Sequence, residues 1–249
     1  MTNNLVSIIM ASHNSALFIE ESIESVLNQT YMNWELLISD DCSTDHTKEI
    51  VSQYAKQDQR ICFIEAKRNS GPAVTRNRAI SRAKGRYIAF LDSDDLWTPN
   101  KLQKQIACLT ANKAVLSYGY YDVIDEDGNY IKTIKKLPRH TTYNKLLKNQ
   151  VIGCLTAIYD RDLCGTIKMP VIRKRQDFGL WLRILKGNHK AICVNSVIGT
   201  YRLRKGSVSS NKWIAVRYTW KIYRKVERLS LLKSSYVFSH YLARRIMRS

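Results

Sequence analysis

The stretch GRYIAFLDSDDLW, residues 85–97, joins an apolar run to a cluster of carboxylates. The run RYIAFLD has the length and composition of a buried β-strand. Asp92, Asp94 and Asp95 stand at the end of that strand. Like charges held this close repel each other and raise one another's pKa values unless a cation neutralises them. The stretch therefore predicts a strand end that carries a cation.

Three further strand-like runs precede this one, and segments of helical spacing separate them. The strand-like runs are LVSIIMAS, WELLISD and ICFIEA, at residues 5–12, 34–40 and 61–66. The helical segments cover residues 15–29, 43–55 and 71–85. Strands that alternate with helices this regularly predict a parallel, doubly wound α/β sheet.

Polar residues cluster where these strands end, at Ser12–Asn14, Asp40–Asp41 and Asp92–Asp95. Ligands of open parallel sheets bind outside the carboxyl ends of the strands. Because three strand ends share this feature, we expect a ligand site along that edge of the sheet.

The alternation is less regular after Asp95. We expect a helix at about 99–111, a strand at 114–123 and a hairpin that turns at Asp127-Gly128. A short helix (142–150), a strand (154–160), a helix (175–187) and a strand (190–203) complete the expected elements. From Asn211 to Ser249 the chain is basic and is expected to be helical, which predicts a division into residues 1–210 and a tail, 211–249.

The composition narrows the class of partner and the compartment. The 249 residues suit one large domain with an appendage, and the formal charge of +19 points to polyanions: nucleic acid, an anionic membrane surface or phosphorylated small molecules. The six cysteines form no C-x-x-C pair, so we expect free thiols, mostly in the core, and a reducing cytosol. The N-terminus lacks the basic region of a signal peptide, and no apolar stretch approaches the ~20 residues that span a bilayer.

An Asp-x-Asp-Asp strand end is a hard-oxygen site, which suits Mg²⁺ or Mn²⁺ rather than Zn²⁺. Mg²⁺ is usually held by one or two carboxylates, while substrate phosphates and water complete its shell. The cluster therefore predicts a metal that bridges the protein and a diphosphate. For one of Asp94 and Asp95, the competing interpretation is a cap of the following helix.

Several classes of enzyme place an acidic motif or a phosphate site after a strand. In haloacid-dehalogenase phosphatases the Asp-x-Asp motif follows the first strand, whereas here it follows the fourth. Sugar nucleotidyltransferases need a glycine-rich basic loop after strand one, and MASHNSALF contains no glycine. No G-x-G-x-x-G motif or P-loop is present.

Five motifs decide between these classes: VSIIMASHN, ESVLNQTYMNWELLISDDCSTDHT, NSGPAVTRNRAI, GRYIAFLDSDDLW and RQDFGLWLRI. By their order and spacing, the chain resembles glycosyltransferase family 2 across roughly its first 205 residues. The resemblance implies a GT-A fold, which is a Rossmann-like α/β fold with a mixed central sheet. It also implies an inverting, nucleotide-sugar-dependent transferase of the kind that builds bacterial surface polysaccharides.

The resemblance further implies a donor site. Asp41 would accept a hydrogen bond from the uracil ring, and Arg76 would help to hold the base side of the pocket. Asp94 or Asp95 would ligate the metal directly. For His13, a cap of the first helix is the alternative. The residues placed at the nucleotide sugar are Ala11, His13, Asn14, Asp40, Asp41, Arg76, Asp92, Ser93 and Asp94.

On the acceptor side, the resemblance makes Asp177 in RQDFGLWLRI the catalytic base. A first-turn acid that stabilises its helix is the other interpretation. Gln176 replaces the family's usual Glu beside the base. Trp181 either stacks on the acceptor sugar or packs in the core.

Arg202 and Arg204, followed by Lys205, come after the last expected strand. They either pair with the diphosphate in a lid or lie in a solvated loop. Cys42 replaces a common Gly of the family, so we expect the backbone there to avoid positive φ. The Q-x-x-R-W signature of processive relatives is absent, which favours addition of one sugar per acceptor.

These features predict transfer of a hexose from a UDP-sugar to a hydroxyl of a growing, lipid-linked surface glycan (O-antigen, capsule or lipooligosaccharide), with Mn²⁺ or Mg²⁺ as cofactor. The predicted location is the cytoplasm, at the inner face of the cytoplasmic membrane. The rival hypothesis, which rests on the charge, is a nucleic-acid-binding protein without sugar transfer. Because the basic residues match no RNA- or DNA-binding fold, nucleic acid is not an expected partner.

The tail carries ten Lys and Arg residues against one acid, Glu227. On a single helix, its basic residues form a stripe with apolar residues roughly opposite. The stripe is Arg217, Lys221, Arg224 and Arg228, and the apolar set is Ile222, Tyr223, Val226 and Leu229. Such an amphipathic helix either lies in an anionic membrane interface or packs its apolar face on the domain.

Overall fold

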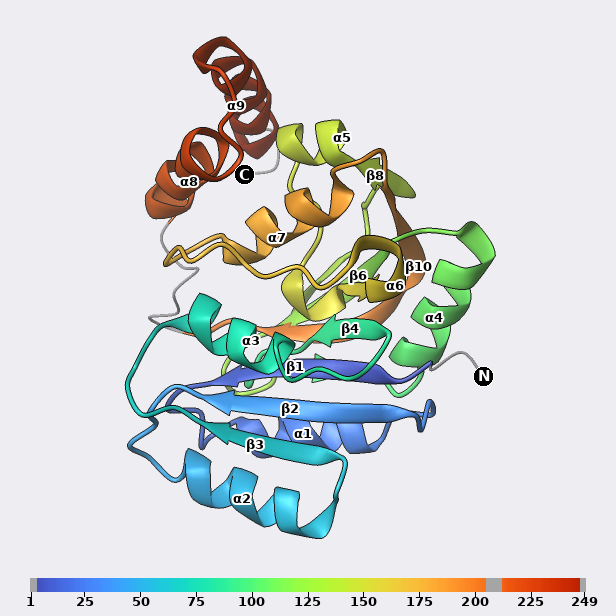
Figure 1. Cartoon of the computed structure of the whole chain (residues 1–249), viewed down its shortest axis with the longest axis vertical. Helices are drawn as coiled ribbons and strands as arrows, with labels where there is room; N and C mark the ends of the chain where they lie inside the picture. Colours follow the sequence, from blue (N-terminus) through green and yellow to red (C-terminus); the bar gives the residue numbers. More distant parts are fainter. Residues whose placement is uncertain (1–3, 205–211, 247–249) are drawn as a thin grey trace.

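The computed structural model describes residues 4–204 and 212–246, and in them one mixed sheet forms the centre of the molecule (Figure 1). Its main path runs β3-β2-β1-β4-β9-β6-β10-β5, with β7 paired to β6 and β8 to β10. The strands are β1 Val6–Ser12, β2 Trp34–Asp40, β3 Ile61–Glu65, β4 Tyr87–Phe90, β5 Leu96–Trp97, β6 Leu116–Ile124, β7 Tyr130–Ile134, β8 His140–Thr142, β9 Ile158–Asp160 and β10 Lys190–Arg202.

The two halves of the sheet are built differently. β1 pairs in parallel with both β2 and β4, and β2 pairs in parallel with β3. β9 then runs antiparallel to both β4 and β6, whereas β10 is parallel to β6. The predicted mixed α/β sheet is therefore confirmed, and the doubly wound part is the half that contains β1 to β4.

Helices cover both faces of the sheet (Figure 1). Because successive side chains of a strand point to opposite faces, Ile8 and Met10 pack on one face with Ile23, while Ile9 packs on the other with Phe178. The helices are α1 Ile19–Leu27, α2 Thr47–Gln57, α3 Pro72–Ile80, α4 Lys101–Asn112, α5 Tyr143–Lys148, α6 Arg161–Cys164, α7 Gln176–Leu185, α8 Lys212–Lys221 and α9 Leu231–Ile246.

Three local expectations need adjustment. β4 ends at Phe90, so the carboxylates lie in a turn beyond the strand, closed by a bond from the Asp95 N–H to the Asp92 carbonyl (3.1 Å). Residues 154–156 form a 3₁₀ turn before β9 rather than part of the strand. The six cysteines are free thiols, but only Cys193 is buried in the core, whereas Cys108, Cys154 and Cys164 are partly buried at its margin and Cys62 is exposed.

The tail does not form the expected single amphipathic helix. α8 passes into a π-helical turn, Ile222–Val226, and the chain then breaks at Arg228 (φ 53°) before α9 begins. Ile222, Tyr223 and Leu229 are buried in the core that also contains α7. The apolar face that these three residues form is therefore packed inside the protein. Of the residues named for the lid and the tail, Lys205, Asn211 and Arg248 lie outside the described residues.

Within the described part of the chain, no helix combines the length and the apolar character that crossing a bilayer requires.

Candidate active site

The loop after β2 begins with Asp40, whose carboxylate lies wholly inside the protein. It accepts hydrogen bonds from the Ser43 N–H (2.8 Å), the Ser43 hydroxyl (2.5 Å) and the Ser12 hydroxyl (3.1 Å). These contacts join the end of β2 to the end of β1. The side chain of Asp40 does not reach the surface in this structure, and its predicted contact with the nucleotide stays a prediction.

Asp41 is also nearly buried, but it holds a different segment. Its two carboxylate oxygens accept the N–H groups of Ser70 (2.9 Å) and Gly71 (2.7 Å). Gly71 has a φ of 81°, a left-handed conformation that favours glycine. Asp41 therefore fixes the turn that leads into α3, the helix that carries Arg76.

The loop after β1 is tied to the loop after β2. The Asn14 N–H donates to the Ser43 hydroxyl (2.9 Å), and the Asn14 side-chain oxygen accepts the Thr44 N–H (2.9 Å). His13 is exposed and lies 3.5 Å from the Asn69 amide nitrogen through its Nε2 atom, while Ala11 is partly buried. No side chain caps α1, so the helix-cap interpretation of His13 is wrong.

The backbone at Cys42 has a φ of 64°, which contradicts the expectation for this position. A left-handed non-glycine residue costs about 1–2 kcal/mol. The neighbouring hydrogen bonds offset that strain, because the Cys42 thiol donates to the Ala66 carbonyl (3.1 Å) and Ser43 is held by Asp40.

In the turn after β4, arginines supply the positive charge. The buried Arg76 donates through Nη2 to Asp92 Oδ1, and its Nε–H has no hydrogen-bond partner. Burial alone would lower the pKa of Arg76, but the charges of Asp92, Cys154 and Asp177 raise it. Arg76 thus pairs with the β4 turn and lies within electrostatic reach of Asp177, on α7.

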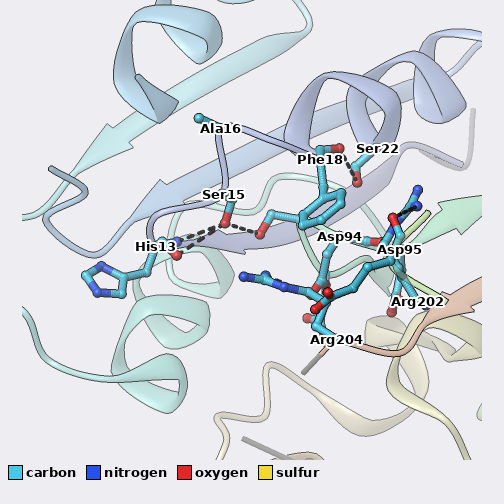
Figure 2. Close-up of polar contacts among 12 residues, drawn as sticks. His13, Ser15, Ala16, Phe18, Ser22, Asp94, Asp95, Arg202 and Arg204 are labelled. Atoms are coloured by element: carbon cyan, nitrogen blue, oxygen red, sulfur yellow. Dashed lines mark hydrogen bonds and ion pairs between the residues drawn. The ribbon is translucent and has the colours of Figure 1, made fainter. Parts of the chain in front are cut away.

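Asp94 faces the second arginine, Arg204, which lies just beyond β10. Its Oδ2 atom accepts a hydrogen bond from Arg204 Nη1 at 3.1 Å, and the Arg204 guanidinium lies 5.1 Å from the Phe18 ring centroid (Figure 2). Burial and the charge of Asp92 raise the pKa of Asp94, which Arg204 only partly offsets. Asp94 keeps a partly exposed carboxylate.

Asp95 is almost fully buried and points the other way along the turn. Its Oδ1 atom accepts the backbone N–H of Arg202 (3.0 Å), which joins the β4 turn to the end of β10. Burial, with the charges of Asp94 and Asp92, raises the pKa of Asp95 well above its ordinary value. In this arrangement one oxygen of Asp95 is used by the Arg202 N–H, and its role as a metal ligand stays a prediction.

Arg202 holds the turn together instead of facing the donor. Its guanidinium donates to the Glu21 carboxylate (2.5 Å) and to the main-chain carbonyls of Asp94 (3.1 Å) and Glu126 (3.3 Å). Only 4% of its side chain is exposed, and its pairing with the diphosphate stays a prediction. Ser93, placed at the nucleotide sugar, is likewise turned inward and shares a 2.8 Å hydrogen bond with the Ser15 hydroxyl.

Asp177 lies in the first turn of α7 and is partly exposed. Arg175, directly before the helix, has a φ of 64° and donates to the Gln150 side chain. Gln176 is buried at the site, and its Oε1 atom has no hydrogen-bond partner. Trp181 is wholly buried against Phe90, with ring centroids 5.3 Å apart, so its acceptor-side assignment is wrong and it belongs to the core.

Comparison with known proteins accounts for this arrangement. The family model described as Glycosyl transferase family 2 matches residues 7–167. The chain belongs to glycosyltransferase family 2.

Two curated relatives of this family 2 chain match along most of both lengths. The putative teichuronic acid biosynthesis glycosyltransferase TuaG of Bacillus subtilis is 45% identical over 97% of this chain and 96% of its own. WfgD of Escherichia coli, named UDP-Glc:alpha-D-GlcNAc-diphosphoundecaprenol beta-1,3-glucosyltransferase, is 44% identical over 89% and 86%. The chain is thus an enzyme, a glycosyltransferase of family 2.

The solved structure of S. aureus TarS residues 1–349 in complex with UDP-GlcNAc resembles the chain in fold. It superposes with a TM-score of 0.76 at 20% identity, covering 100% of this chain and 74% of TarS. The predicted GT-A fold is therefore confirmed.

Three residues of the family 2 site carried no recognisable signal in the sequence. In the sequence, Phe18 and Glu21 only fit the spacing of the first helix. In the structure, Phe18 lies beside the guanidiniums of Arg202 and Arg204, and Glu21 binds Arg202. Cys154, in the 3₁₀ turn, lies close enough to Arg76 and Asp177 for their charges to affect its thiol. All three depend on contacts between segments far apart in the chain.

Proposed function

We propose that the chain is an inverting transferase that moves a hexose from a UDP-hexose to a hydroxyl of a lipid-linked surface glycan. The carrying observation is that Arg76, on α3, pairs with Asp92 in the β4 turn and lies within electrostatic reach of Asp177, on α7. A donor-binding carboxylate and a candidate base on facing segments are what a single displacement needs.

The donor would lie across the carboxyl ends of β1 and β2. Asp41 would stand at the base side of the donor, where its remaining acceptor capacity would suit a ring N–H of uracil. Ala11, near the end of β1, and His13 and Asn14, in the loop that follows β1, would lie against the base and ribose. The UDP-Glc in the name of WfgD and the UDP-GlcNAc bound to TarS support a UDP-sugar donor.

Asp177 would act as the base. It lies in the first turn of α7 and is partly exposed, so its carboxylate is open to an acceptor hydroxyl. A carboxylate is a weak base for a free hydroxyl, but the acceptor hydroxyl becomes acidic as it bonds to the anomeric carbon. Attack opposite the departing diphosphate then gives an inverted product, a β-glycoside from an α-linked donor.

The donor set at the β4 turn fits Mn²⁺ or Mg²⁺. Asp92 and Asp94 retain partly exposed carboxylates, with 27% and 24% of each side chain exposed, and hard oxygen ligands suit these ions. Across residues 4–204 and 212–246, no group of three His, Cys, Asp or Glu side chains is arranged to hold a metal. The donor diphosphate would therefore supply further ligands. When bound, the ion supplies charge neutralisation for the leaving diphosphate.

Arg204 would contact the diphosphate from the other side. It is the arginine of the pair that remains partly exposed, at 32%, and its present partner Asp94 is the residue that would receive the metal. A guanidinium binds phosphate oxygens in a bidentate manner, which suits this position.

The acceptor would be a sugar hydroxyl on a lipid diphosphate, as the diphosphoundecaprenol in the name of WfgD suggests. Gln176 would contact it, because its buried, unpartnered Oε1 atom lies next to Asp177. Such an acceptor places the reaction at the cytoplasmic face of the membrane, where the product would enter O-antigen, capsule or a related glycan.

A donor screen on purified protein tests the proposal. UDP-hexoses would be offered with a short-chain lipid-diphosphate sugar and Mn²⁺, and UDP release and product would be followed by chromatography and NMR. We expect one UDP-hexose to be transferred with inversion at the anomeric carbon. Retention of configuration, or transfer from other nucleotide sugars alone, would contradict the proposal.

A further inference from the structure

The outward side of α9 carries an apolar edge that the packing of the tail leaves uncovered. Leu231, Leu232 and Tyr236 are 61%, 85% and 54% exposed. They lie within two turns at the start of the helix, whereas Val237 and Tyr241 on its other side are buried. We name the exposed trio the α9 edge.

Basic side chains surround the α9 edge. Lys148, from α5, places its Nζ atom 3.0 Å from the Tyr236 hydroxyl and 4.5 Å from its ring centroid. Lys225, Arg228 and Lys233 are exposed on the neighbouring turns. The surface near the edge is therefore apolar at its centre and positive around it.

The acid of the tail does not balance these charges at the surface. The Glu227 carboxylate is buried, where it accepts a hydrogen bond from the Tyr143 hydroxyl (2.6 Å) and pairs with Lys186 Nζ (2.9 Å). These two contacts fix the tail to α5, through Tyr143, and to Lys186 directly after α7. Glu227 therefore does not neutralise the exposed lysine and arginine side chains near the α9 edge, and these remain available to an anionic partner.

We propose that the α9 edge is the surface by which the protein binds an anionic phospholipid bilayer. Exposed leucines with a tyrosine insert at the headgroup boundary, while surrounding lysines and arginines are attracted to anionic lipid. A second copy of the chain is a poorer occupant, because it would bring the same positive charges face to face. This surface differs from the stripe expected from the sequence, whose apolar residues are buried.

The tail also couples this surface to the helix of the candidate base. Tyr223 packs on Phe178 with ring centroids 6.1 Å apart, and Ile222 approaches Gly179 so closely that a Cβ there would lie 3.2 Å from Ile222 Cδ1. Phe178 and Gly179 follow Asp177 directly in α7. In a step that rests on the proposed function, bilayer contact would hold the acceptor side at the membrane that contains the lipid-linked substrate.

Vesicle sedimentation tests the proposal with two variants of the full chain. Leu231→Ser/Leu232→Ser removes the apolar part, and Lys225→Gln/Lys233→Gln removes two charges. Their controls are Ile131→Ser/Leu163→Ser, which removes two other exposed apolar side chains, and Lys56→Gln/Lys132→Gln, which removes two distant exposed charges. Vesicles of phosphatidylcholine with phosphatidylglycerol are compared with phosphatidylcholine alone, at low and high salt.

We expect the parent protein to bind the anionic vesicles and to be released by salt. The leucine variant should lose about tenfold or more in partitioning, because two leucine side chains no longer leave water. The lysine variant should lose several-fold and show a weaker salt dependence. Both controls should bind like the parent, and circular dichroism should show the same helix content in all variants.

Equal binding to both kinds of vesicle, or parent-like binding of the leucine variant, would overturn the proposal. So would a dimer in light scattering that the leucine variant converts to a monomer, which would make a second copy the occupant. Transfer to a water-soluble acceptor separates this proposal from the function. If no sugar is transferred but vesicle binding follows the expected pattern, the proposed function fails and the membrane surface stands.

Discussion

Adjacent aspartates stand at the ends of both β2 and β4, but the groups that bind their carboxylates differ. After β2, Asp40 and Asp41 accept backbone N–H groups and hydroxyls and are nearly inaccessible. After β4, Asp92 and Asp94 are paired with arginine side chains and stay partly exposed. Backbone donors cannot leave without a change of fold, whereas an arginine side chain moves by rotation. The β2 end is therefore built to fix loops, and the β4 end to exchange its cation.

Asp94→Ala should have the largest effect on transfer. We expect transfer to fall by about 10⁴-fold, since the variant loses metal-assisted stabilisation of several kcal/mol and each 1.4 kcal/mol is tenfold. Mn²⁺ binding by calorimetry should fall with it, and thermal stability should be kept. The matched control is Asp95→Asn, which retains an acceptor for the Arg202 N–H and should bind Mn²⁺ like the parent. If Asp94→Ala were fully active in excess EDTA, the assignment of a catalytic metal to this turn would be wrong.

Asp177→Asn tests the candidate base on α7 separately from the carboxylates that follow β2 and β4. Transfer should fall by about a thousandfold, within the range that general-base catalysis contributes, because the amide keeps the size of the side chain and loses its basicity. UDP and Mn²⁺ affinities, measured by calorimetry, should stay within about twofold, as Asp177 is placed on the acceptor side. Turnover at close to the parent rate would assign the base to another residue.

Asp40→Ala tests whether the β2 end is structural. The substitution leaves the Ser43 N–H and hydroxyl and the Ser12 hydroxyl without their acceptor inside the protein. We expect the free energy of unfolding in urea to fall by about 3 kcal/mol. Asp127→Ala, at an exposed hairpin position, should change it by less than about 0.5 kcal/mol. A loss of UDP binding at unchanged stability would instead place Asp40 in the pocket.

Much of the fold follows from local patterns in the sequence. The β/α alternation up to Phe90, the hairpin at Asp127-Gly128 and the helix at residues 176–185 were all predictable, because apolar periodicity and turn residues determine them. The sequence also located the site edge, because polar residues follow three parallel strands.

The orientation of individual side chains was less predictable. Asp40 and Asp41 are adjacent, yet their partners, Ser43 and the Ser70–Gly71 turn, lie in different segments. Asp95 binds Arg202, more than a hundred residues away in the chain. The tail was misjudged for the same reason, since burial of Ile222 and Tyr223 depends on α7. Local spacing gives the faces of a helix but not the surface that each face meets.

Arg204→Gln has the smallest expected effect. It tests most directly whether a carboxylate after β4 exchanges an arginine for a metal ion. If Arg204 is the exchangeable cation of Asp94, its removal should raise the Mn²⁺ affinity of the nucleotide-free protein by about twofold to fivefold, the size of a partly exposed ion pair. The same variant should bind UDP more weakly, because the diphosphate loses its guanidinium contact. Lys56→Gln, which removes a distant exposed charge, should alter neither affinity. A general loss of positive charge would shift the two affinities in these same directions in both variants, so unchanged affinities in Lys56→Gln would assign the effect to the position of Arg204 beside Asp94. A parallel fall of both in Arg204→Gln would show instead that Arg204 only shapes the turn, as Arg202 does.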